Sequence, residues 1–121
     1  MNIAGIGIDI EAIDRFRSRP LKKHRRFYQR IFTAKEINYC LKRPDPYQHF
    51  AARFCAKEAV IKAMSGKTIL HQDIEVLSSS GEPRINLTRK KLPRYKIPVK
   101  ITVKETKQYS QRFKKLRNSK L

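Results

Sequence analysis

Acidic residues, cysteine and glycine are scarce in this 121-residue chain, which has 10 Asp or Glu, 2 Cys, 4 Gly and no Trp. Cys40 and Cys55 are too few and too far apart for a disulfide framework or a zinc site, so we expect a reducing, cytoplasmic environment. No apolar run approaches the roughly 20 residues of a membrane-spanning helix. Neither a GxxxxGK[ST] nor a GxGxxG phosphate loop occurs. These absences argue against a disulfide scaffold, a membrane-spanning protein and the common nucleotide-binding loops.

Positive charge is abundant instead. The chain has 29 Lys or Arg and a formal net charge of +19, which raises the concentration of anions near its surface. Nucleic acid, an anionic membrane, a polyphosphate ligand and an acidic protein are all candidate partners, and a Lys-rich proteome is the ordinary alternative. The length fits one domain, residues 1–121.

The stretch "NIAGIGIDI" alternates at period two and predicts a strand with one apolar and one bare face. The apolar positions are Ala4, Ile6, Ile8 and Ile10. The other face carries Gly5, Gly7, Asp9 and Glu11, and its glycines allow a backbone or a ligand to come close. Asp9 is unexpected here, because aspartate is a poor strand former and a buried carboxylate needs a positive partner.

The next part of the chain is expected to be helical. Residues 15–30 are strongly basic, and Pro20 divides them into two short helical pieces. In "FTAKEINYC", Thr33 and Glu36 have the spacing of a capping box, which predicts a helix from about residue 34. The "RPDP" turn ends that helix.

The clearest helix runs from Tyr47 to about residue 65 and has two apolar stripes. The bulky stripe is Phe50, Phe54, Ile61 and Met64, and the small one is Ala52, Ala56, Ala59 and Ala63. A helix apolar on both sides is packed between other elements, and a neighbouring subunit is one candidate.

A β-hairpin is expected after this helix. Residues 74–77 and 84–87 flank the turn "SSSGEP". Residues 97–103 alternate as a further strand, and the basic tail after them is left unassigned.

Glu58 and Lys62 lie four residues apart on the long helix. Alone they would be an ordinary surface pair. However, Arg53 and Lys57 repeat the spacing with like charges, which costs stability unless an anion lies between them. One carboxylate beside several cations suits a phosphate bridged by Mg²⁺, which takes only one or two protein carboxylates. We hypothesise that Asp9 is the second carboxylate.

The histidines give no catalytic pattern. His24, His49 and His71 lack metal-ligand spacing, and each is expected to be a surface or packing residue. His49 is the exception to watch, because it lies one turn before Arg53.

Four motifs in order, "GIGIDIEAIDR", "RIFTAKEINYC", "FAARFCAKEAVIKAM" and "QDIEVLSSSGEPRINL", resemble the holo-acyl-carrier-protein synthases, the small 4′-phosphopantetheinyl transferases. The resemblance covers about residues 3–87. It implies an α+β fold with an antiparallel sheet packed on helices, a homotrimer, and an active site between neighbouring subunits. It also implies transfer of the phosphopantetheine arm of coenzyme A to a serine of acyl carrier protein in fatty acid biosynthesis, with release of adenosine 3′,5′-bisphosphate.

The resemblance also suggests roles for single residues. Asp9 and Glu58 match the Mg²⁺ ligands, and Lys62 matches the lysine near the coenzyme A pyrophosphate; these three are the expected catalytic residues. The expected cofactor-binding residues are Arg53, Lys57, Lys62, His49 and Gly66. The basic residues expected to bind the acidic carrier protein are Arg15, Lys22, Lys23, Arg25 and Arg26. The general base for the serine stays open between Glu58 and a metal-bound water.

One departure leaves other functions open. The family usually has a Ser-x-Ser/Thr-His stretch in a late strand, whereas "KITVKETKQYSQRF" has no histidine, so Lys104 or Thr106 would have to replace its contact. An inactive homologue that binds without transfer is therefore one alternative. A nucleic-acid-binding module is the other, suggested by the charge, although none of the usual binding motifs occurs.

Overall fold

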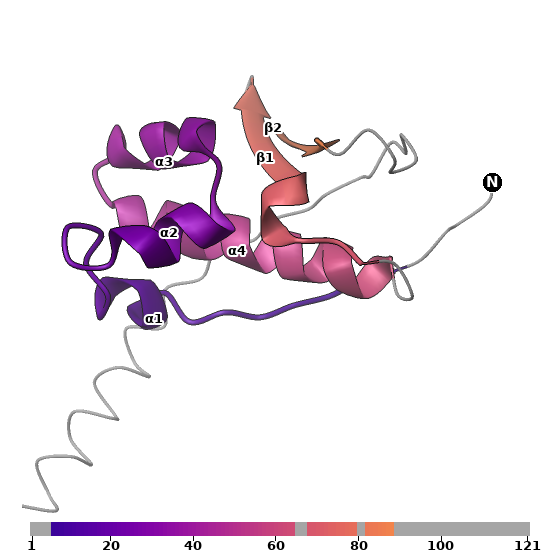
Figure 1. Cartoon of the computed structure of the whole chain (residues 1–121), viewed down its shortest axis with the longest axis horizontal. Coiled ribbons are helices and arrows are strands. Elements are labelled where there is room, and N and C mark those ends of the chain that lie inside the picture. Colours follow the sequence, from indigo (N-terminus) through magenta and orange to yellow (C-terminus); the bar gives the residue numbers. More distant parts are fainter. Residues whose placement is uncertain (1–5, 65–67, 80–81, 89–121) are drawn as a thin grey trace, which may run out of the picture.

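The computed structural model describes residues 6–64, 68–79 and 82–88 of the chain (Figure 1). Helices come first, and an antiparallel hairpin follows a single 3₁₀ turn. The elements are α1 (Asp14–Arg17), α2 (Arg25–Ile31), α3 (Ala34–Leu41), α4 (Pro46–Ala63), η1 (His71–Asp73), β1 (Ile74–Ser79) and β2 (Glu82–Leu87). This arrangement confirms the predicted α+β class. In the part of the chain described, no helix is both long and apolar enough to cross a bilayer.

The helix boundaries follow the local signals in the sequence. Pro20 lies between α1 and α2, so the basic stretch forms two helices as predicted. At the start of α3 the capping box is complete, because Glu36 N–H donates to Thr33 Oγ1 at 3.3 Å and Thr33 N–H donates to Glu36 Oε1 at 2.9 Å. Pro46 begins α4, where a missing N–H costs nothing.

The hairpin also forms where it was expected. Ile74 pairs with Leu87 and Ser79 with Glu82 in an antiparallel register. The predicted strand at 97–103 and the basic tail lie outside the described residues.

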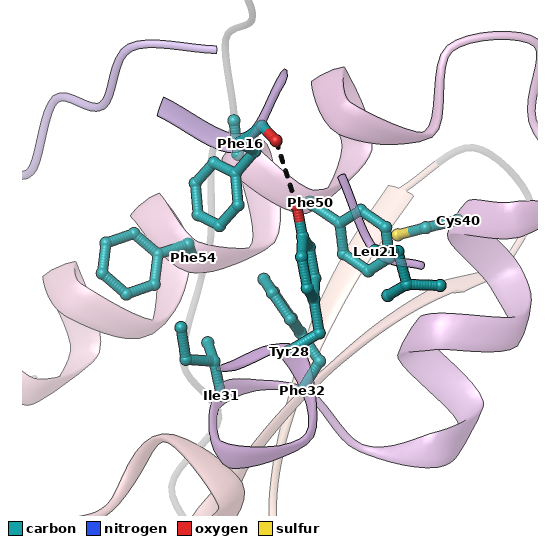
Figure 2. Close-up of a cluster of buried hydrophobic side chains, with 9 residues drawn as sticks. Phe16, Leu21, Tyr28, Ile31, Phe32, Cys40, Phe50 and Phe54 are labelled. Atoms are coloured by element: carbon teal, nitrogen blue, oxygen red, sulfur yellow. Dashed lines mark hydrogen bonds between the residues drawn. The ribbon is translucent and has the colours of Figure 1, made fainter. Parts of the chain in front are cut away.

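The main core gathers around the first half of α4, with aromatic rings in contact (Figure 2). Its buried members are Phe16, Leu21, Tyr28, Ile31, Phe32, Cys40, Phe50, Ala51 and Phe54. The Tyr28 hydroxyl lies inside this cluster and bonds to the Phe16 carbonyl at 3.1 Å, so its polar atom is satisfied. A smaller cluster, Val60, Ile69 and Ile74, joins the second half of α4 to the hairpin. Helix α4 is therefore the central element, as its two apolar stripes indicated.

The N-terminal segment, residues 6–12, differs from the prediction. It runs along α4 in the opposite direction (Figure 1). Among the described residues it pairs with no strand, since their one sheet contains only β1 and β2. Its bare face, not its apolar face, lies on the protein. The predicted core residues Ile6, Ile8 and Ile10 are 76, 76 and 90% exposed.

The expectation that glycine permits a close backbone approach is confirmed. A Cβ on Gly7 would lie 1.7 Å from the carbonyl oxygen of Ala59 in α4. Only a residue without a side chain fits there, which explains why the glycine face turns inward.

Candidate functional site

The N-terminal segment lies across one face of α4. Residues 55, 58, 59 and 62 share this face by their helical spacing. Cys55 Sγ donates to the Asp9 carbonyl at 3.0 Å, and Lys62 Nζ approaches the Ile8 carbonyl at 3.3 Å. Burial, with Asp9 beside it, raises the pKa of the Cys55 thiol to about 11, so this thiol stays protonated. The contacts fasten Asp9 beside Lys62, on the face of α4 that also carries Glu58.

Asp9 pairs with a lysine, as expected for a carboxylate that is buried. Its Oδ1 accepts a hydrogen bond from Lys62 Nζ at 3.0 Å. Its Oδ2 is buried and has no hydrogen-bond partner among the described residues. A buried carboxylate oxygen left unpaired costs free energy, so this atom marks a place for a further cation. The bond to Asp9 raises the pKa of Lys62, and the negative charges of Asp9 and Glu58 add to the effect.

Glu58 has a partner that the sequence did not indicate. Its Oε1 lies 2.6 Å from Nε2 of His71, in η1. The His71 imidazole is stacked on the Phe54 ring, with centroids 5.4 Å apart and planes inclined by 17°. The prediction that His71 is an ordinary surface or packing residue is therefore incomplete, because the ring also contacts a site carboxylate.

Arg15 lies beside this group. Its guanidinium is 5.0 Å from the centroid of the Phe54 ring, and it forms an ion pair with Glu11 at 3.0 Å. The rest of the predicted carrier-protein surface is exposed at and just before the start of α2. These residues are Lys22, Lys23, Arg25 and Arg26.

Arg53 and His49 lie beside Tyr39, away from Asp9, Glu58 and Lys62. The Arg53 guanidinium lies 4.1 Å from the Tyr39 ring centroid, and His49 meets that ring edge-on at 5.9 Å. Burial lowers the pKa of His49, and the charges of Arg53 and Arg43 lower it further. By helical spacing, positions 49 and 53 face away from 58 and 62. The described part of one chain therefore does not bring all the predicted cofactor residues together.

A pocket of about 360 Å³ opens beside Arg53, and it is rich in positive charge. Lys35, Arg53 and Arg84 line it together with Tyr39 and Ser78. The Nε of Arg53 is buried and has no partner among the described residues. A hydrogen bond with Ser78 lowers the pKa of Tyr39, and the neighbouring arginines act in the same direction. This pocket suits an anionic group.

The surroundings of Lys57 do not fit its predicted role as a cofactor-binding residue. Its side chain is fully buried, and Nζ donates to Glu36 Oε1 at 2.6 Å and to the carbonyls of Ile31 at 2.6 Å and His71 at 3.0 Å. Burial lowers the pKa of Lys57, and Glu36 opposes that effect. The ammonium is already used by three acceptors inside the protein, so a cofactor phosphate cannot reach it here. Gly66, the remaining predicted cofactor residue, lies outside the described residues.

The acids on the α4 face suit Mg²⁺ by donor type. Over residues 6–64, 68–79 and 82–88, no three His, Cys, Asp or Glu side chains gather as a self-sufficient metal site. Mg²⁺ does not require one, because water and phosphate oxygens complete its octahedron. The unpaired Oδ2 of Asp9 is the observation that fits a cation.

Comparisons with known proteins agree on one family. A family model described as the 4′-phosphopantetheinyl transferase superfamily matches residues 5–113. The holo-[acyl-carrier-protein] synthase of Chlamydia felis is 46% identical over 90 residues, which cover 72% of this chain and 74% of the relative. The protein of the same name from Thermodesulfovibrio yellowstonii is 35% identical over 113 residues, covering 92% and 96% of the two chains.

Solved structures give the same result for the fold. The holo-[acyl-carrier-protein] synthase of Neisseria meningitidis superimposes with a TM-score of 0.62 at 29% identity, covering 71% of this chain and 72% of its own. The holo-ACP-synthase of Plasmodium yoelii gives 0.59 at 27% identity, with coverages of 74% and 71%.

Proposed function

Because the chain belongs to the 4′-phosphopantetheinyl transferase superfamily, we propose that it is a holo-[acyl-carrier-protein] synthase of fatty acid biosynthesis. It would transfer the 4′-phosphopantetheine group from coenzyme A to a serine of apo-acyl carrier protein and release adenosine 3′,5′-bisphosphate. The observation that carries the proposal in this chain is the α4 face where Asp9 and Lys62 are bonded beside Glu58.

Asp9 and Glu58 would hold Mg²⁺, and Oδ2 of Asp9 is the atom without another partner. When bound, Mg²⁺ neutralises charge on the pyrophosphate and polarises the phosphorus that is attacked. Lys62 Nζ, 3.0 Å from Asp9 Oδ1, would stabilise the negative charge that grows on the phosphate oxygens. Glu58 remains a candidate base for the serine hydroxyl.

A second subunit would complete the site. Arg53 and His49 lie on the side of α4 away from Glu58 and Lys62, beside a pocket that suits an anion. A ligand with two separate phosphate groups, such as coenzyme A with its pyrophosphate and its 3′-phosphate, can use both sides if α4 helices of neighbouring subunits face each other. This division supports the homotrimer with active sites between subunits. Arg53 and His49 would then bind a cofactor phosphate.

The carrier protein would approach the exposed basic residues at the start of α2, with Arg15 connecting them to the site. Complementary charge accelerates the encounter of an acidic partner and makes it sensitive to salt. We propose that this encounter takes place in the cytoplasm.

Intact-mass measurement after incubation with coenzyme A, Mg²⁺ and apo-acyl carrier protein tests the proposal. We expect the carrier protein to gain one phosphopantetheine in the presence of Mg²⁺ and none when the metal is chelated. Asp9→Asn and Glu58→Gln should abolish the gain, whereas Asp14→Asn, at an exposed position of α1, should not. No mass gain from the wild-type protein would refute the transferase and leave an inactive homologue or a nucleic-acid-binding module.

A further inference from the structure

We propose that His71 is a positioning residue that fixes the carboxylate of Glu58 for its cation. The inference rests on the proposed function, because it concerns the same site. It gives a role to a side chain that no metal-ligand or catalytic pattern in the sequence indicates.

The contact between the two side chains is short and directional. His71 Nε2 lies 2.6 Å from Glu58 Oε1. A carboxylate oxygen accepts, so the hydrogen lies on Nε2 and the imidazole donates. One oxygen of Glu58 is thereby engaged, and the other has no hydrogen-bond partner among the described residues. A flexible glutamate is thus held by one oxygen while the second is left for a ligand.

The His71 ring is itself held in place. It is stacked on Phe54, with centroids 5.4 Å apart and planes inclined by 17°. Phe54 is buried in the main core (Figure 2), so the ring on which the imidazole stacks has a fixed position. The imidazole therefore meets Glu58 from a fixed direction.

The backbone of His71 is anchored to the interior as well. Its carbonyl accepts from Lys57 Nζ at 3.0 Å, and Lys57 is paired with Glu36 at 2.6 Å. Both partners of that ion pair are fully buried. A continuous series of contacts therefore runs from the buried pair to His71 and on to Glu58. An incidental surface pair would have no such anchors, and most surface pairs contribute little.

Hydrogen bonds that orient metal-binding side chains typically change metal affinity or activity by about 10- to 100-fold when they are removed. We expect His71→Phe, which keeps a ring on Phe54 but lacks the N–H, to weaken metal binding within that range. His71→Gln offers an amide N–H near the position of Nε2, so it should recover most of the affinity. The matched control is His24→Phe, because His24 is exposed and, among the residues that the structure describes, its ring bonds only to the nearby Pro20 carbonyl.

The experiment measures Mn²⁺ binding by electron paramagnetic resonance in the presence of coenzyme A, and the Mg²⁺ dependence of transfer. Supporting results are a rightward shift of both curves for His71→Phe, recovery by His71→Gln, and no shift for His24→Phe. Unchanged curves for His71→Phe, or equal losses in the Phe and Gln variants, would overturn the inference while wild-type transfer still supports the enzyme. If the wild-type protein does not transfer, the proposed function fails, and the Mn²⁺ curves still test whether His71 orients Glu58.

Discussion

Helix α4 carries two lysines that each pair with a carboxylate from another segment, and the two pairs differ in their surroundings. Lys57 pairs with Glu36 at 2.6 Å, and both side chains are 0% exposed. Lys62 pairs with Asp9 at 3.0 Å, with side chains 55% and 11% exposed. The first pair is surrounded by core residues, whereas in the second the Lys62 side chain lies at the surface and the Asp9 carboxylate is largely buried.

The difference in surroundings indicates a structural role for Lys57 and a functional role for Lys62. A buried ammonium with three acceptors has no donor left for a ligand, so Lys57 stabilises the arrangement of α2, α3, α4 and η1. An exposed ammonium with room beside it can still meet a phosphate, so Lys62 remains available for chemistry. The family resemblance suggested a cofactor-binding role for both lysines, and burial distinguishes them.

The largest expected effect comes from breaking the buried pair. Lys57→Ala leaves Glu36 as an uncompensated buried charge, so it should reduce the free energy of unfolding by about 3–5 kcal/mol. Urea denaturation followed by circular dichroism measures this loss. The control Lys42→Ala, at an exposed position after α3, should change stability little. A loss below about 1 kcal/mol would show that the pair is not structural.

Removing the exposed Lys62 should lower the rate of transfer strongly and the stability only slightly, the reverse of removing Lys57. Lys62→Ala should lower the rate of transfer by about 10²- to 10³-fold, the range for a lost donor to developing negative charge. Its stability should fall by less than that of Lys57→Ala, because the Lys62 ammonium is half exposed and solvated. Steady-state kinetics and urea denaturation on the same preparation test both parts. A variant that transfers normally would remove Lys62 from the site.

Gly7→Ala tests the close approach that places Asp9 next to Lys62. The new Cβ would lie 1.7 Å from the Ala59 carbonyl, so the segment must shift away from α4. We expect a stability loss of about 1–3 kcal/mol, typical of overpacking, together with a lower rate of transfer. Ala12→Ser, at an exposed position of the same segment, is the control. Wild-type stability and rate in Gly7→Ala would mean that the segment is not seated on α4 as described.

The smallest effect concerns the stability contributed by the pair of Asp9 with the exposed Lys62. Asp9→Asn should alter the free energy of unfolding by less than about 1 kcal/mol, and the difference should shrink in 1 M NaCl, where exposed charges are screened. Glu36→Gln is the matched comparison, because its larger loss should persist in salt. Equal salt dependence of the two variants would contradict the contrast between the pairs.

Local signals predicted much of the helical part and the hairpin. The capping box at Thr33, Pro20 and the two apolar stripes of α4 act over a few residues, so they can be recognised without the fold. The N-terminal segment was less predictable. Its alternation indicated a strand, but a strand needs a neighbour to pair with, and the described residues place none beside it. Which face turns inward depended on the contact between Gly7 and α4.

The site was predicted in part for the same reason. Asp9 and Glu58 were paired as a hypothesis, and the fold brings Asp9, Lys62 and Glu58 to one face of α4. His71 was missed as a partner of Glu58, because the two are separated by 13 positions along the chain and no recognisable motif connects them. Lys57 was misassigned, because spacing along a helix reveals a side but not what covers it.

The sequence by itself determined where helices begin, which residues form the hairpin, the strongly positive charge and the family motifs, because each depends on neighbouring residues or on composition. Only the tertiary structure decided which lysine is buried, which face of the N-terminal segment touches α4, and that an imidazole meets Glu58. Those outcomes depend on contacts between distant segments, where desolvation and close packing act on side chains that local patterns treat as equivalent.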